Sequence, residues 1–125
     1  MVLHGSWNQI GLDIDGETAD DYSGWSVSFS SDGNRVAIGA FGNDGSGSIA
    51  GHVRVYEYVD DWEQIGDDID GEAGQDWSGY SVSLSSDGRR VAIGAPYNDG
   101  SGNNAGHVKV YEFSEPEPEP EPEPE

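Results

Sequence analysis

The sequence predicts an all-β fold built from two copies of one small antiparallel sheet. The chain repeats itself at an offset of 55 residues: Trp7–Tyr58 overlays Trp62–Phe113 without a gap, and 37 of the 52 pairs are identical. Within each copy, short segments alternate between apolar and polar residues, which is the period of a strand. No ten-residue window has the apolar spacing of an amphipathic helix, so both copies should be built from strands alone.

Each repeat contains four segments with strand patterning. They are rich in Val, Ile and aromatic residues, and Gly, Asp, Asn and Ser bound them. In the first repeat these segments are Trp7–Gly11, Trp25–Ser30, Arg35–Ala40 and His52–Glu57. Ser31–Asn34 and Ser86–Arg89 predict tight hairpin turns, because their Asp-Gly pairs supply the positive φ that such turns need.

The repeat also predicts the organisation of the chain: an N-terminal lead at 1–6, repeat 1 at 7–61, repeat 2 at 62–113 and a Glu-Pro tail at 114–125. Only Val59–Asp61 separates the two overlaid segments, so the units should stack directly on each other. In the tail, proline removes hydrogen-bond donors and the glutamates repel one another. We therefore expect residues 114–125 to be disordered and extended, like polyproline.

The two faces of each sheet should differ in size. We expect Val27, Phe29, Val36, Ile38, Val53 and Val55 on a bulky face, and Ser26, Ser28, Ala37 and Gly39 on a small one. A bulky face on a small face allows close stacking, yet two stacked sheets leave one face of each kind uncovered. A ring of about 4 to 8 four-stranded blades, a β-propeller, covers every face. Two repeats are too few to close one.

The strand motifs resemble the FG-GAP repeat of integrin-α-type β-propellers. The resemblance rests on Ser78–Ser83, Val91–Pro96 and Gly106–Tyr111, in that order, with Ser in place of the family's Phe and Gly39-Ala40-Phe41 in place of GAP in repeat 1. It implies that the strand after the FG position is innermost. Trp62–Gly66 would then complete the first blade from outside, and the second blade would lack its outer strand.

The unused N-terminal strand suggests exchange between chains. Trp7–Gly11 should pair with the open edge of the second blade in a neighbouring chain, through Trp7, Gln9 and Ile10 on one side and Val108, Val110 and Tyr111 on the other. Head-to-tail contacts of this kind form rings when the rotation closes, here from two, three or four chains. The alternative is that the chain is a piece of a longer propeller.

Composition excludes several classes of partner. With 25 acidic and 5 basic residues the formal charge is -20, which opposes binding to nucleic acid or to an anionic membrane surface. No segment is apolar enough to insert into a membrane, and no signal peptide is visible. The chain has no cysteine, so thiol catalysis and thiolate metal sites are excluded.

Aromatic residues and acids near the start of each inner strand are the candidate ligand site. An exposed Trp or Tyr beside carboxylates stacks on a sugar ring and hydrogen-bonds its hydroxyls. The alternative is that Trp25 and Tyr80, which are equivalent in the repeat, pack between the blades. The candidates are Asp20, Asp21, Tyr22, Trp25, Asp76, Trp77 and Tyr80.

No cofactor is expected, although acidic loops raise the question of calcium. The positions that hold calcium in many FG-GAP repeats are Ser83, Ser85, Asp87 and Val91 here, and the first repeat is equally poor in acids. Asp13–Glu17, Asp68–Glu72 and Asn43–Gly47 contain oxygen ligands without the full spacing of a calcium loop. His52 and His107 begin equivalent strands, where a structural hydrogen bond explains them.

Together these observations predict a binding or adhesion module without enzymatic activity, because no nucleophile and base can be paired. Its ligand would be a protein or a glycan, and the resemblance favours an extracellular or cell-surface location. The alternative is a purely structural repeat unit, or a fragment of a larger acidic surface protein, with no ligand of its own.

Overall fold

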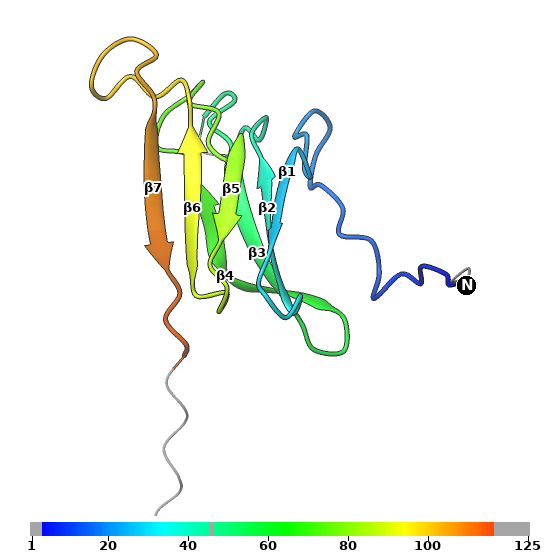
Figure 1. The fold of residues 1–125 in the computed structure, drawn as a ribbon. Coiled ribbons are helices and arrows are strands. Elements are labelled where there is room, and N and C mark those ends of the chain that lie inside the picture. The colour runs from blue at the N-terminus through cyan, green and yellow to red at the C-terminus, as the bar shows by residue number, and fades with distance from the viewer. Residues whose placement is uncertain (1–3, 46, 117–125) are drawn as a thin grey trace, which may run out of the picture.

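The computed structural model describes residues 4–45 and 47–116, and these residues contain seven strands and no helix. Figure 1 shows them as two sheets that lie face to face. The strands are β1 (Ser26–Phe29), β2 (Arg35–Ala40), β3 (His52–Tyr58), β4 (Trp62–Asp70), β5 (Ser81–Leu84), β6 (Arg90–Ala95) and β7 (His107–Glu112). The all-β fold with blade-like antiparallel sheets is confirmed. No helix among the described residues is long and apolar enough to cross a membrane.

The two sheets differ by one strand. The first has the order β1-β2-β3-β4 and the second the order β5-β6-β7, all antiparallel. β4 is the predicted outer strand of the first blade and runs to Asp70, beyond the predicted end at Gly66. The second blade therefore lacks its fourth, outer strand in the single chain, as expected. Residues 7–11 form no strand in the single chain, because no strand edge lies beside them to take their backbone hydrogen bonds.

Both predicted hairpin turns are present and have the same chemistry. In the first, Asp32 accepts hydrogen bonds from Ser30 Oγ at 2.8 Å and from the Asn34 amide at 2.9 Å. In the second, Asp87 does the same for Ser85 and Arg89, at 2.7 and 3.0 Å. The two aspartates thus serve as turn residues.

Strand register corrects the assignment of the faces. β2 and β3 pair Ala37 with Val55 and Gly39 with Val53, and residues directly opposite each other share a face. Val53 and Val55 therefore lie on the small face and not, as predicted, on the bulky one. The bulky face of the first sheet carries Val27, Phe29, Val36, Ile38, Arg54 and Tyr56. The small face of the second sheet carries Ser81, Ser83, Ala92, Gly94, Val108 and Val110.

The core forms where the small face of the first sheet meets the bulky face of the second. Its buried members are Ala37, Val53, Leu84, Val91 and Ile93, flanked by Val55, Ile69 and Val82. The backbones approach closely on this side: Ser26 Oγ donates to the Gly79 carbonyl at 2.7 Å, and the Leu84 amide donates to Ser28 Oγ at 2.9 Å. Small residues on one face are what allow this approach.

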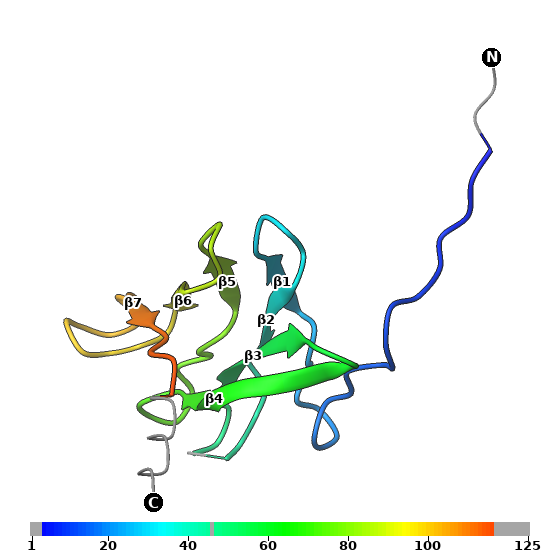
Figure 2. The same cartoon turned by 90° about the horizontal axis from the view of Figure 1, so that it is seen from below.

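The N-terminal segment leaves the body of the protein beside the first sheet (Figures 1 and 2). Trp62 Nε1 donates to the Ile10 carbonyl at 2.9 Å, and the Leu12 amide donates to Asp61 Oδ1 at 2.9 Å. A hollow of about 410 Å³ separates the segment from the bulky face, with Ile10, Phe29 and Val36 among its lining residues. The expectations for residues 117–125 of the tail lie outside the described residues.

Candidate functional site

An aromatic cleft lies between the two blades, at the loops that lead into β1 and β5. Its volume is about 700 Å³. The residues that line it are Asp20, Tyr22, Trp25, Phe41, Gly42, Asp44, Ser48, Ile49, Trp77 and Tyr80. Five of them are aromatic and come from both repeats, so the stacking of the blades builds the cleft. We call this feature the aromatic cleft.

Phe41 is the centre of the aromatic cluster. Its ring stacks on Tyr22 at 5.3 Å and on Trp77 at 5.0 Å, and it meets Trp25 and Tyr80 edge-on at 5.0 and 5.4 Å. Phe41 itself is buried, whereas Tyr22 and Trp25 are each 56% exposed. The cluster therefore has a packed interior and presents aromatic surface to solvent.

The loops below the cleft hold two aromatic residues in an unfavourable backbone conformation. Tyr22 has a φ of 54° and its repeat equivalent Trp77 a φ of 60°, and Asp20 and Gln75 are also left-handed. Such a φ is an outlier for a bulky side chain and costs roughly 1–3 kcal/mol. Both repeats have it, so this backbone conformation is a property of the repeat.

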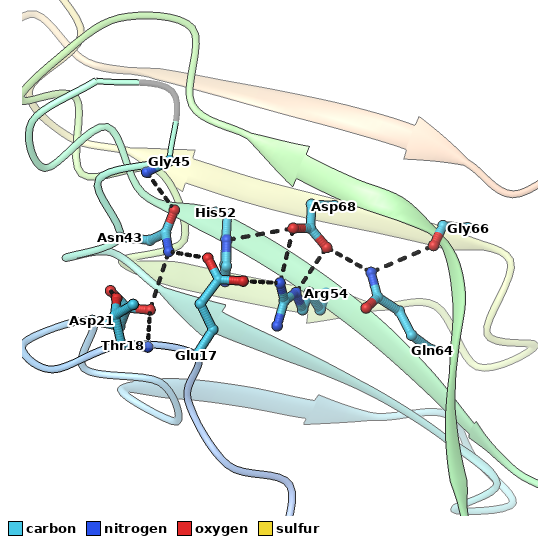
Figure 3. A network of polar contacts seen from close by, with 10 residues as sticks. All are labelled: Glu17, Thr18, Asp21, Asn43, Gly45, His52, Arg54, Gln64, Gly66 and Asp68. Atoms are coloured by element: carbon cyan, nitrogen blue, oxygen red, sulfur yellow. Dashed lines mark hydrogen bonds and ion pairs between the residues drawn. The ribbon is translucent and has the colours of Figure 1, made fainter.

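Buried hydrogen bonds hold the first of these loops in place (Figure 3). Asn43 is buried and donates to Asp21 Oδ2 at 3.1 Å and to Glu17 Oε1 at 3.0 Å, while its own oxygen accepts from the Gly45 amide. Thr18 donates to Asp21 through its hydroxyl and its amide. Burial raises the pKa of Asp21, but these hydrogen bonds outweigh it, and the net shift of the pKa is downward.

The same network recurs in the second repeat. Asn98 donates to Asp76 Oδ2 at 2.9 Å and to Glu72 Oε1 at 3.2 Å, and it accepts from the Gly100 amide. Lys109 pairs with Glu72 where Arg54 pairs with Glu17 in the first repeat. The hydrogen bonds that hold the loop are therefore a property of the repeat. The aromatic residue that the loop carries differs between the copies, Tyr22 in the first and Trp77 in the second.

The structure divides the predicted ligand residues into two groups. Asp20, Tyr22, Trp25, Trp77 and Tyr80 line the aromatic cleft. Asp21 and Asp76 are buried beneath it and do not line it. Sequence reasoning missed Phe41, although the signal was visible: it stands where the second repeat has Pro96 of the GAP motif.

An ion-pair network extends from the loops to β4. Arg54 donates to both oxygens of Asp68, at 2.7 and 2.9 Å, and to Glu17 Oε2 at 2.6 Å. Gln64 also donates to Asp68, at 2.7 Å. The guanidinium of Arg54 lowers the pKa of Asp68 to about 2. Asp68 therefore stays ionised throughout the physiological range.

His52, Asp68 and Asp70 have ligand atoms within 4.8 Å of one another, which is the spacing of a metal site. Arg54 already occupies both oxygens of Asp68 and supplies the positive charge that a metal ion would bring. The donor set therefore fits an ion pair better than a cation site. The segment Asn43–Gly47, which the sequence also offered as a source of oxygen ligands for calcium, includes residue 46, and that residue lies outside the described residues.

The open edge of β7 and the N-terminal segment are the other predicted site. Val108, Val110 and Tyr111 are exposed along β7, and Trp7, Gln9 and Ile10 are exposed in the segment. Within the single chain these two groups do not meet. In the first sheet, the equivalent edge of β3 is covered by β4.

A comparison with protein-family models matches residues 68–111 to the FG-GAP repeat. The match begins in β4 and ends in β7, so it contains the whole of β5 and β6 and most of the edge strand. No curated protein matches the chain. With its motifs, its blade-like sheets and this match, the chain carries an FG-GAP repeat at residues 68–111.

Proposed function

We propose that this protein is a non-enzymatic binding or adhesion module that completes a β-propeller by exchanging its N-terminal strand between copies. The ring binds a protein or a glycan at its aromatic clefts, in an extracellular or cell-surface setting typical of FG-GAP repeats. One observation carries the proposal. Residues 7–15 have the same local hydrogen bonds as the outer strand β4 but pair with no strand, and β7 is a sheet edge that has no outer strand beside it.

The likeness between the N-terminal segment and β4 is specific. Gln64 donates to the Gly66 carbonyl at 3.4 Å and to Asp68 at 2.7 Å; Gln9 donates to the Gly11 carbonyl at 3.3 Å and to Asp13 at 2.8 Å. The two glycines also agree, with φ of 70° and 74°. A segment that already has the bend of its bound state loses less entropy when it pairs.

The repeat also predicts the register of exchange. β3 and β4 pair Tyr58 with Trp62, Tyr56 with Gln64, Val55 with Ile65 and Val53 with Ile69. Shifting each residue by one repeat gives the contacts between copies. They are Phe113 with Trp7, Tyr111 with Gln9, Val110 with Ile10 and Val108 with Ile14. The exchanged strand is then residues 7–15, longer than the Trp7–Gly11 segment that shows strand patterning.

Two substitutions in the N-terminal segment test the exchange. Ile10→Asp places a charge where β4 has Ile65, and it should reduce the mass of the assembly to that of a single chain. Leu12→Asp is the matched control, because β4 carries Asp67 at the equivalent position and tolerates it. An Ile10→Asp variant with the same native mass as the unmodified chain would contradict strand exchange.

The ligand is tested separately. Exposed aromatic rings beside Asp20 and Asp44 suit stacking on a sugar or a protein side chain. Binding on a glycan array or to candidate surface proteins should be lost in Trp77→Ala and Tyr80→Ala and kept in Val59→Ala, which lies outside the cleft. An intact assembly without any ligand would favour a purely structural repeat unit.

A further inference from the structure

We infer that the bulky face of the first sheet docks on the small face of the second sheet of another copy, and so repeats between chains the contact that joins the two blades within one chain. The inference rests on the proposed function, because the same neighbour would supply the exchanged strand. The occupant of both open faces is therefore a second copy of this chain.

Equivalent residues show which surfaces are unpartnered. Val53 is fully buried between the blades, whereas its equivalent Val108 on the small face of the second sheet is 67% exposed. Leu84 is 8% exposed between the blades, whereas its equivalent Phe29 on the bulky face of the first sheet is 62% exposed. Val53 and Val108 are the same residue type at the same strand position, and they differ in the blade that covers Val53. On the bulky face of the first sheet Val27 and Phe29 are exposed, whereas Val36 and Ile38 are buried, at 7% and 8%, beside the hollow that the N-terminal segment also lines. The two open faces are thus the two halves of a contact that the chain already makes once.

The polar contacts between the blades have counterparts on the open faces. Ser26 Oγ donates to the Gly79 carbonyl and Ser28 Oγ accepts from the Leu84 amide. One repeat away, these become Ser81 with the Gly24 carbonyl and Ser83 with the Phe29 amide of the next copy. Both serines of the small face are exposed in the single chain.

An arginine follows the same pattern. Arg35 lies at the rim of the contact between the blades, where its side chain is 12% exposed and donates to the Gly88 carbonyl at 3.1 Å. The side chain of its equivalent, Arg90, is 66% exposed. In the docked pair Arg90 would reach the Gly33 carbonyl of the next copy. A guanidinium at the rim adds a charge-assisted hydrogen bond to an otherwise neutral contact.

The chemistry of the faces favours a copy over an unrelated protein. The centre of the small face of the second sheet is uncharged, although the chain carries a formal charge of -20. On the bulky face of the first sheet, the charge of Arg54 is already paired with Glu17 and Asp68. A partner must therefore offer apolar and hydroxyl groups at the spacing of a twisted sheet, with glycine or alanine where backbones approach. The chain itself presents that surface, and the heterologous contact leaves one free face of each kind to continue the ring.

Docking would also complete a second aromatic cleft. A hollow of about 270 Å³ at the end of the second repeat is lined by Gly74, Gln75, Trp77, Tyr97, Asp99 and Asn104. Five of these residues are the equivalents of Asp20, Tyr22, Gly42, Asp44 and Ile49 in the aromatic cleft, with Pro96 in place of Phe41 in the second repeat. The hollow lacks the wall that a second blade supplies in the aromatic cleft. By the repeat, Tyr22 and Trp25 of the next copy would form that wall. Each junction between chains then carries a cleft that neither chain has alone.

A charge on the small face tests the docking. Ser83 lies on β5, at the opposite side of the three-stranded sheet from the β7 edge. Ser83→Glu therefore does not contact the exchanged strand directly, while it places a carboxylate where the in-chain contact has Ser28. We expect the variant to keep the far-ultraviolet spectrum of the unmodified chain and to have the native mass of one chain. Ala92→Glu, at the equivalent of the fully buried Ala37, should behave alike. Val59→Glu adds the same charge in the exposed turn between β3 and β4, outside the cleft, and should assemble normally.

Cross-linking tests the pairing of the two faces directly. The chain has no cysteine, so one copy with Phe29→Cys and another with Ser83→Cys each carry one thiol. A short bifunctional thiol cross-linker should join them into covalent dimers when they are mixed and give none with either variant alone. Ser28→Cys with Leu84→Cys in one chain is the in-chain control, since these residues are in contact.

The outcomes separate this inference from the proposed function. Assembly of Ser83→Glu and Ala92→Glu as in the unmodified chain, or cross-linking of one variant with itself, would overturn docking of the two faces. Strand exchange would survive that result if Ile10→Asp still dissociates the assembly. An unmodified chain that stays a single chain at all concentrations would overturn both.

Discussion

A Cβ atom on Gly39 would lie 2.1 Å from the carbonyl oxygen of Gly79, in the neighbouring blade. No side chain fits there, so the contact between the blades depends on this glycine. The equivalent Gly94 faces no second blade, and its nearest neighbour would be the hydroxyl of Ser81, which can rotate away. The space around this glycine therefore differs between the two repeats according to whether another blade is packed against the sheet.

This contrast predicts different effects for two alanine substitutions. Gly39→Ala should lower the free energy of unfolding by roughly 1–3 kcal/mol, because overpacking pushes the blades apart. Gly94→Ala should leave the stability of the single chain nearly unchanged and weaken assembly instead. Urea unfolding of dilute protein, beside native mass at higher concentration, measures both. Equal losses of single-chain stability would contradict the comparison.

The pair of Arg54 and Asp68 predicts a loss of stability in acid. The pKa of Asp68 is lowered to about 2 in the folded chain, against ~3.9 when unfolded. Its contribution is therefore complete above the unfolded value and is lost as the pH falls from about 4 toward 2. Arg54→Met should cost about 1–2 kcal/mol at pH 7 and flatten this part of the pH profile.

The control for that prediction is Lys109→Met, which removes an exposed ion pair at the equivalent position. Exposed pairs contribute about 0–1 kcal/mol, so this variant should differ little from the unmodified chain. Urea unfolding at pH 7, 4 and 2.5 distinguishes the two variants. An Arg54→Met variant that loses as much stability between pH 4 and 2.5 as the unmodified chain would argue against the assignment.

The buried asparagine of each loop should control the aromatic cleft. Asn43→Ala removes donors to Asp21 and Glu17 and leaves a buried carboxylate short of one hydrogen bond. We expect a loss of about 1–3 kcal/mol in unfolding free energy. We also expect a change in near-ultraviolet circular dichroism, as Tyr22 and Phe41 move. A stable variant with an unchanged aromatic spectrum would mean that other contacts hold the loop.

Salt should favour assembly. Each copy carries a formal charge of -20, so copies repel one another at low ionic strength, and the Debye length falls to about 8 Å at 0.15 M. The protein concentration at which half of the chains are assembled should therefore be lower in 150 mM salt than in 10 mM salt. Analytical sedimentation measures this concentration. Weaker assembly at higher salt would indicate that ion pairs, rather than apolar faces, join the copies.

The resemblance to the FG-GAP repeat made the strand order predictable, including the role of Trp62–Gly66 as the outer strand of the first blade, which in the structure runs on to Asp70. The face of Val53 and Val55 was predicted wrongly, because both faces of β3 carry large side chains and alternation alone does not choose between them. Pairing with the small residues Ala37 and Gly39 makes the choice.

The candidate site was predictable in part for a similar reason. The aromatic residues stand out in the sequence, and five of the seven predicted residues line the cleft. From the sequence, Asp21 and Asp76 resemble ligand-binding carboxylates. In the structure both are buried and accept hydrogen bonds from asparagine side chains. Those partners, Asn43 and Asn98, lie 22 positions further along the chain, and only the folded loops bring them into contact.

The native mass of the intact chain, beside its 13.3 kDa monomer, tests the central claim most directly. Strand exchange between copies predicts a single closed species of two, three or four chains. It also predicts that this species is lost in Ile10→Asp and kept in Leu12→Asp. A stable monomer at every concentration, or the same mass for both variants, would contradict it.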